Sequence, residues 1–135
     1  GNNPRICIFL MLKNSLKRYL DNMKKQIEYL DYDKVEICVG TIIDAYPNPK
    51  AKKPAYVLKI DFGEKKGNKI SSAQITNYYK VTDLIGKQIM AVCNFGNKNI
   101  AGIVSEVLVL GAIEEDGKVV LFHPSQKVKN GLKIA

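Results

Sequence analysis

The chain has 135 residues, of which 46% are hydrophobic and 25% charged, enough for one globular domain of roughly 100 residues and an extension. Its formal net charge of +8 favours an acidic partner, with nucleic acid ahead of a membrane surface. The three cysteines without a CxxC pair and the single histidine exclude a disulfide framework and the usual zinc sites, so we expect no metal, no cofactor and a reducing, cytoplasmic compartment.

The N-terminal part of the chain predicts a helix. Between residues 12 and 30, apolar residues recur every three or four positions, which places them on one stripe of a helix. These positions are Leu12, Leu16, Leu20, Met23, Ile27 and Leu30. We expect the stripe to be buried on the following domain or on a partner subunit. The apolar run at residues 6–12 is too short to span a bilayer, so we expect no membrane insertion.

After Lys34 the hydrophobic period changes to two, which predicts strands. Strands are expected at residues 37–44, 56–62, 68–72 and 89–95, in a β-rich run at 102–113, at 119–123 and at an edge, 131–134. A short helix is expected at residues 74–79, and the GEKKG of residues 63–67 predicts a hairpin loop. Apolar residues on both faces at 107–110 predict a strand buried on both sides.

This order of strands and one short helix suits an all-β fold. A five-stranded OB-type barrel with a C-terminal elaboration, preceded by the N-terminal helix, fits it well. The pattern alone leaves an SH3-like barrel as a close alternative. By alternation, we expect Tyr56, Phe62, Phe95 and Phe122 to belong to the core. Tyr46, Tyr78 and Tyr79 are expected to be exposed.

Motifs typical of catalysis are absent from the sequence. Neither a GxxxxGK[ST] nor a GxGxxG phosphate loop is present. Of the HIGH-like and KMSKS-like motifs of synthetase cores, only a superficial match to the second occurs, the KISSA of residues 69–73. His123 precedes a proline and is expected to be structural or exposed. The sequence therefore favours a binding protein over an enzyme.

Lysines gather in the predicted loops. Lys50, Lys52 and Lys53 lie between the first two strands, where OB-folds commonly contact nucleic acid, and Lys98 lies in the loop after the fourth strand. Lysine lacks the planar guanidinium that reads base edges with two hydrogen bonds. We therefore expect recognition of an RNA backbone and its shape.

Three segments carry a resemblance to a known family. They are residues 57–63 (VLKIDFG), 71–76 (SSAQIT) and 94–111 (NFGNKNIAGIVSEVLVLG). Together they resemble the tRNA-binding-domain family, in particular its stand-alone CsaA branch. The family also includes the C-terminal appendage of many methionyl-tRNA synthetases and the endothelial-monocyte-activating-polypeptide domain. The resemblance begins near Leu30, which implies an extension at residues 1–29 and a tRNA-binding OB-fold domain at residues 30–135.

The resemblance implies part of the binding site. Asn94, Lys98 and Ser105 match the family's tRNA-contact pattern, N-[LF]-x(2–4)-[RK] followed by G-x-x-S. Asparagine and serine could instead make hydrogen bonds at a turn or a strand end. Asn99 stands where CsaA proteins usually have a second basic residue, which suggests weaker RNA binding. With the loop lysines, the expected RNA-binding residues are Lys50, Lys52, Lys53, Asn94, Lys98 and Ser105.

The resemblance implies a homodimer that binds tRNA without base specificity. As an alternative to this leading function, the resemblance also implies an export-related chaperone for unfolded or preprotein polypeptides. A third alternative is a tRNA-binding appendage cut from a methionyl-tRNA synthetase. The SSAQIT and SEVLVL segments disfavour this third alternative, and so does Leu108, where the synthetase-appended branch has methionine.

Overall fold

A computed structural model describes residues 4–135 of the protein, and residues 1–3 of the predicted extension lie outside the described residues. The chain divides into two compact units, residues 1–32 and 33–135. No helix in the described part has the length and hydropathy needed to cross a bilayer.

The N-terminal helix is confirmed, but its bounds differ from those predicted. Helix α1 spans Pro4–Asn22, residues 24–28 are not helical, and a short helix α2 follows at Tyr29–Asp33. The prediction of one helix as far as Leu30 was therefore wrong. Proline suits the first turn of a helix, and asparagine is a weak helix former at its end. Within this unit the apolar stripe is exposed, so no packing there supports a longer helix.

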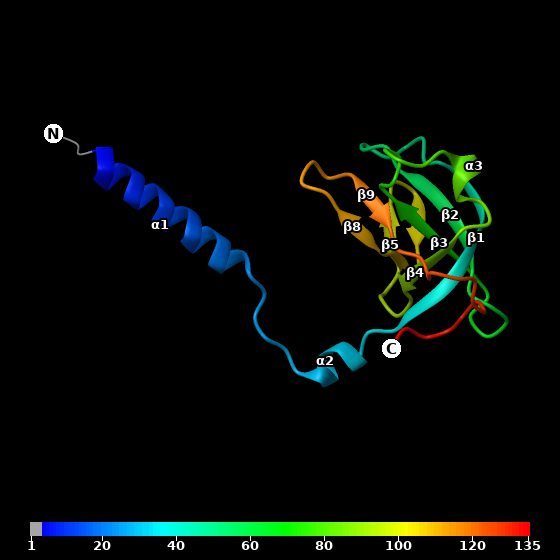
Figure 1. The fold of residues 1–135 in the computed structure, drawn as a ribbon. Helices are drawn as coiled ribbons and strands as arrows, with labels where there is room; N and C mark the ends of the chain where they lie inside the picture. The colour runs from blue at the N-terminus through cyan, green and yellow to red at the C-terminus, as the bar shows by residue number, and fades with distance from the viewer. Residues whose placement is uncertain (1–3) are drawn as a thin grey trace. The chain divides into compact units, whose positions relative to one another are not determined.

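The second unit is an all-β barrel of the predicted OB type (Figure 1). Its main sheet has five antiparallel strands in the order β3-β2-β1-β4-β7. These are β1 (Ile37–Pro47), β2 (Tyr56–Asp61), β3 (Asn68–Ala73), β4 (Gln88–Val92) and β7 (Leu108–Val109). Two hairpins are added by β5 (Lys98–Ile100) with β6 (Ile103–Ser105) and by β8 (Gly111–Ile113) with β9 (Val119–Leu121).

Strand β1 is long because it serves both halves of the barrel. Residues 37–41 pair with β4 and residues 41–47 pair with β2, with a register shift between Ile42 and Asp44. Gly40 lets β1 pass close over the core, since a Cβ there would lie 2.6 Å from Ile60 Cγ2. The strand reaches Pro47, beyond the predicted end, because a proline at the last position removes no interior hydrogen bond.

The barrel closes where β3 meets the chain after β6. The Glu106 N–H donates to the Ile70 carbonyl at 2.7 Å. Serine side chains complete this closure: the Ser72 N–H donates to Ser105 Oγ at 3.1 Å, and Ser71 Oγ donates to the Val107 carbonyl at 3.0 Å. Side-chain hydroxyls thus replace part of the backbone ladder along this seam.

The core is aliphatic with one large aromatic residue. Its fully buried side chains include Phe62, Ile42, Leu58, Ile60, Leu84 and Ile89. Two of the aromatic residues predicted for the core lie at the surface, because Phe95 is 55% exposed and Phe122 is 45% exposed. The alternation fails for Phe95 because β4 ends at Val92, after which the chain turns away from the ladder. Tyr79, predicted to be exposed, is half-buried and accepts a hydrogen bond from the Leu121 N–H.

Three secondary-structure predictions also need correction. The short helix is α3 (Val81–Leu84), while residues 76–78 form a turn. Asp83 accepts a hydrogen bond from the Lys80 N–H, which fixes the start of this helix. The run at 102–113 is divided among β6, β7 and β8, so its predicted strand buried on both faces does not exist. Residues 131–134 form no regular strand, but they lie along β1 through three backbone hydrogen bonds and the bridge between Lys133 and Cys38.

Candidate nucleic-acid interface

The loop between β1 and β2 is held by hydrogen bonds of one buried residue, Asn48. Asn48 is 7% exposed, and its N–H donates to the Ala55 carbonyl at 2.9 Å. Its side-chain oxygen accepts from the Lys50 N–H at 3.2 Å, and its amide nitrogen donates to the Ile100 carbonyl at 3.4 Å. This one residue therefore closes the loop and ties it to the β5–β6 hairpin. Sequence reasoning missed Asn48, although an asparagine between two prolines is a signal for a turn with a side-chain hydrogen bond.

Two depressions lie next to each other beside this loop. The first, which we call the lysine depression, has a volume of about 530 Å³ and is lined by Lys50, Lys52 and Lys53. The second, the apolar depression, has a volume of about 320 Å³ and is lined by Lys98, Ser105 and several apolar side chains. Ser72 and Ile100 line both, so the two depressions share a wall.

The structure thus brings together five of the six predicted site residues, and Asn94 lines neither depression. Asn94 Oδ1 accepts from the Glu36 N–H at 2.9 Å, and Asn94 Nδ2 donates to the Lys34 carbonyl at 2.7 Å. These bonds fix the entry into β1 at the start of the loop that leads to Lys98. The exposed amide retains one N–H and one oxygen lone pair.

Ser105 is also engaged inside the protein. It is 8% exposed, accepts from the Ser72 N–H and donates to the Val107 carbonyl at 3.4 Å. The sequence left open whether Asn94 and Ser105 make structural hydrogen bonds at a turn or a strand end. Both residues make such bonds.

The site lysines carry unneutralised charge. Within the described residues, the recorded ion pairs are Lys66–Glu36, Lys69–Glu106, Lys118–Asp116 and Lys133–Asp33. Lys50, Lys52, Lys53 and Lys98 are exposed and belong to none of these. Glu106, which lines the apolar depression, is held by Lys69 at 3.8 Å and by the Ile70 N–H at 3.1 Å. The field beside the shared wall is therefore positive and suits a polyanion.

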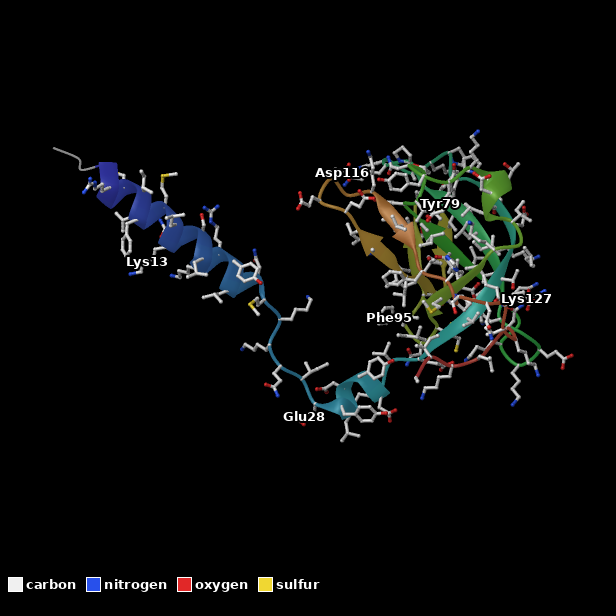
Figure 2. All side chains as sticks on the ribbon, viewed as in Figure 1. Lys13, Glu28, Tyr79, Phe95, Asp116 and Lys127 are labelled. Atoms are coloured by element: carbon white, nitrogen blue, oxygen red, sulfur yellow. The ribbon has the colours of Figure 1, made fainter. Side chains whose placement is uncertain are left out.

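Two further residues belong to this region, although sequence reasoning did not place them there. Ser72 Oγ is buried and has no hydrogen-bond partner within the described part of the chain. Phe95 lines the apolar depression, and Figure 2 shows it well apart from Lys127, which lines a different depression. The SSAQIT segment, residues 71–76, contains Ser72 and pointed to this part of the chain. Its sequence does not show which of its two serines would lack a hydrogen-bond partner.

Titratable groups of the described residues do not form a reactive cluster. No group of three or more His, Cys, Asp or Glu side chains in that part of the chain could hold a metal ion. Burial, followed by the neighbouring Cys38, raises the pKa of the Cys93 thiol to about 11, so this thiol stays protonated and is a poor nucleophile at neutral pH. His123 is exposed, with Nδ1 2.9 Å from the Pro124 carbonyl oxygen.

Comparisons with known proteins agree with this arrangement. Residues 37–133 match the family model described as "Putative tRNA binding domain". Among solved structures, the chain is similar to the CsaA chaperone protein from Picrophilus torridus, with 53% identity and a TM-score of 0.76. It is also similar to chaperone CsaA from Bacillus anthracis str. Ames, with 46% identity and a TM-score of 0.79. Each match covers 82% of this chain and 100% of the other.

Among curated proteins, the chain is similar to the methionine–tRNA ligase of Methanocaldococcus jannaschii. The two are 33% identical over 110 residues, which is 82% of this chain and 16% of the ligase. The chain therefore spans about a sixth of the length of this relative.

Proposed function

Because this chain belongs to the tRNA-binding-domain family, we propose that it binds tRNA through the phosphate backbone and the shape of the folded RNA. The observation that carries the proposal is a set of four exposed lysines around two joined depressions, and none of these lysines forms an ion pair within the described residues 4–135. A lysine contacts a phosphate as a point charge and carries no information about the base. Such a site would accept many tRNAs alike.

We assign roles to the proposed site residues as follows. Lys50, Lys52, Lys53 and Lys98 contact phosphates. Asn94 offers its remaining N–H to a phosphate or a sugar hydroxyl and fixes the loop before Lys98. Ser105 shapes the edge of the apolar depression and offers a neutral hydrogen bond there. These residues all belong to the proposed RNA-binding domain, residues 30–135.

We further propose that the domain forms a homodimer. Exposed apolar side chains on and beside β7, β8 and β9 support this proposal; they are Leu108, Ile113, Val120 and Phe122. A two-fold axis would present two lysine clusters to one RNA and raise avidity without new contacts. Light scattering at micromolar concentration should give twice the 15.1 kDa of one chain. A mass of a single chain would contradict the dimer.

A second candidate function is the holding of unfolded polypeptide. The two similar CsaA proteins are named as chaperones, which favours this function. The apolar walls of the smaller depression, which could receive an apolar side chain, favour it as well. The third alternative, an appendage of a methionine–tRNA ligase, is supported by the curated relative but disfavoured by the higher identity to the CsaA proteins.

One experiment separates the first two candidates. Binding of bulk tRNA and of an unfolded polypeptide is measured on the same sample over a range of salt concentrations. Each phosphate contact contributes about 0.7–0.9 to the slope of log Kd against log salt, so tRNA binding should weaken steeply. Polypeptide binding through apolar contacts should change little. Retention of polypeptide with no tRNA binding at low salt would make the chaperone function the better proposal.

A further inference from the structure

We propose that the apolar depression receives one unpaired base of the bound RNA. The inference rests on the proposed function, since it requires that RNA bind, and it adds recognition of a nucleobase to recognition of the backbone. The base would enter beside Phe95 while the flanking phosphates lie against the lysines. The ligand is thus an unstacked nucleotide within an RNA chain.

The first support is the lining of the depression. Phe95, Ile100 and Val107 supply an apolar surface, and Phe95 remains 55% exposed. Proteins that bind single-stranded RNA stack unpaired bases on such aromatic rings. Its volume of about 320 Å³ lies at the lower end of the range for small-ligand sites. A flat base fits a site of this size and polarity.

The second support is an unsatisfied polar atom. Ser72 Oγ is buried and has no hydrogen-bond partner among the residues that the structure describes, while the Ser72 N–H donates to Ser105 Oγ. A buried hydroxyl without a hydrogen bond costs free energy, which a ligand can recover by bonding to it. Ser72 lines the wall that the two depressions share. Because Ser72 Oγ has almost no solvent-accessible area, the hydroxyl must rotate toward the depression to pair with the donors and acceptors on the edge of a nucleobase.

The third support is charge. Lys98 lines the apolar depression itself, and Lys50, Lys52 and Lys53 line the adjoining one. A nucleotide carries an apolar base next to a negatively charged phosphate. A site that binds it therefore needs an apolar surface next to positive charge. An apolar side chain of a polypeptide would fit the apolar walls but would gain nothing from the four lysines. The combination therefore favours RNA over polypeptide.

A direct test uses fluorescence, because the chain contains no tryptophan. Phe95→Trp places a single tryptophan beside the depression, at an exposed position where the larger ring should not disturb folding. The probes are a single-stranded RNA of about eight nucleotides, an abasic strand of the same length and a blunt duplex. We expect the single strand to shift or quench the tryptophan emission, and the abasic strand and the duplex to leave it unchanged.

Affinity gives an independent test on the unlabelled protein. Phe95→Leu should weaken binding of the single strand about tenfold, the scale of one lost base stack, with an unchanged salt slope because no charge is removed. Ser72→Ala should weaken it by about fivefold. Phe9→Leu changes another exposed phenylalanine, which lies in the extension and lines neither depression, and should have no effect.

The outcomes separate the inference from the function on which it rests. Equal affinity for the single strand and the abasic strand, with steep salt dependence, would overturn the base site and leave tRNA binding intact. A tryptophan signal that responds to unfolded polypeptide and not to RNA would assign the depression to polypeptide. Failure to bind any RNA at low salt would overturn the proposed function, and the inference with it.

Discussion

The lysines around the two depressions should determine how steeply tRNA binding depends on salt. Replacing Lys52, Lys53 and Lys98 by glutamine removes three positive charges and leaves polar side chains that are only one atom shorter. Since none of the three takes part in a recorded ion pair of the described residues, the change breaks no internal interaction. Stability should therefore stay within about 0.5 kcal/mol of the parent protein.

The magnitude follows from counterion release. If each lysine contacts one phosphate, its loss lowers the slope of log Kd against log salt by about 0.7–0.9, so the triple variant should lose roughly 2–3 units. At about 0.15 M salt this corresponds to an affinity about a hundredfold weaker, or close to 3 kcal/mol. Near 1 M salt the two proteins should bind alike, because the electrostatic contribution vanishes there.

The assay is fluorescence anisotropy of labelled bulk tRNA over a series of salt concentrations. The matched control replaces Lys65, Lys80 and Lys129, which line neither depression, and so removes the same charge. Its slope should change by less than about one unit. If the site variant keeps the parent slope and affinity, or if the control loses as much, the lysines beside the shared wall are not the phosphate contacts.

Four further predictions test the fold and the limits of the site. Gly40→Ala forces a Cβ into the packed core and should cost about 1–3 kcal/mol in urea denaturation, whereas Gly96→Ala meets open space and should change stability by less than about 0.5 kcal/mol. Because the pKa of Cys93 is raised to about 11, alkylation of its thiol should be slow near neutral pH, and its rate should rise about tenfold for each unit that the pH increases toward 11, as followed by mass spectrometry. Ser105→Ala leaves a backbone N–H without its acceptor, so it should lower stability by about 1–3 kcal/mol and weaken tRNA binding up to about fivefold without changing the salt slope. A chain that starts at Leu30 should bind tRNA within about tenfold of the full chain, and a larger loss on a folded barrel would make the extension part of the site.

Much of the barrel could be predicted because apolar and polar residues alternate in the sequence of several strands and turn residues separate them. Residues 56–61 form β2 as predicted, although Val57 is as fully buried as Leu58 and so breaks the expected alternation, and the glycine-bounded loop at 63–67 closes the hairpin to β3. The resemblance to the tRNA-binding-domain family, read from three segments, is confirmed by the family match and decides between two barrel types that periodicity leaves open.

Errors arose where tertiary hydrogen bonds end a ladder that the local pattern would continue. In the sequence, the alternation of β4 continues as far as Phe95. In the structure, the Cys93 N–H donates to the Glu36 carbonyl and Asn94 Oδ1 accepts from the Glu36 N–H, so the ladder of β4 ends earlier. Such bonds join residues almost sixty positions apart, as the separation of 58 between Asn94 and Glu36 shows. No local periodicity contains this information. The exposure of Phe95, and hence the apolar depression, could not be predicted from its neighbours in sequence.

The position of the site on the closure seam decides which substitutions can report on binding alone. Ser105 and Ser72 join β3 to the chain after β6, and the same two residues line the apolar depression. Any change that removes the Ser105 hydroxyl alters both the closure of the barrel and the shape of the site. Lys98 and Phe95 are exposed and lie off the seam, so their substitution should leave the barrel intact. A loss of RNA affinity in these two variants therefore measures contact with RNA, whereas a loss in a seam variant must first be corrected for stability.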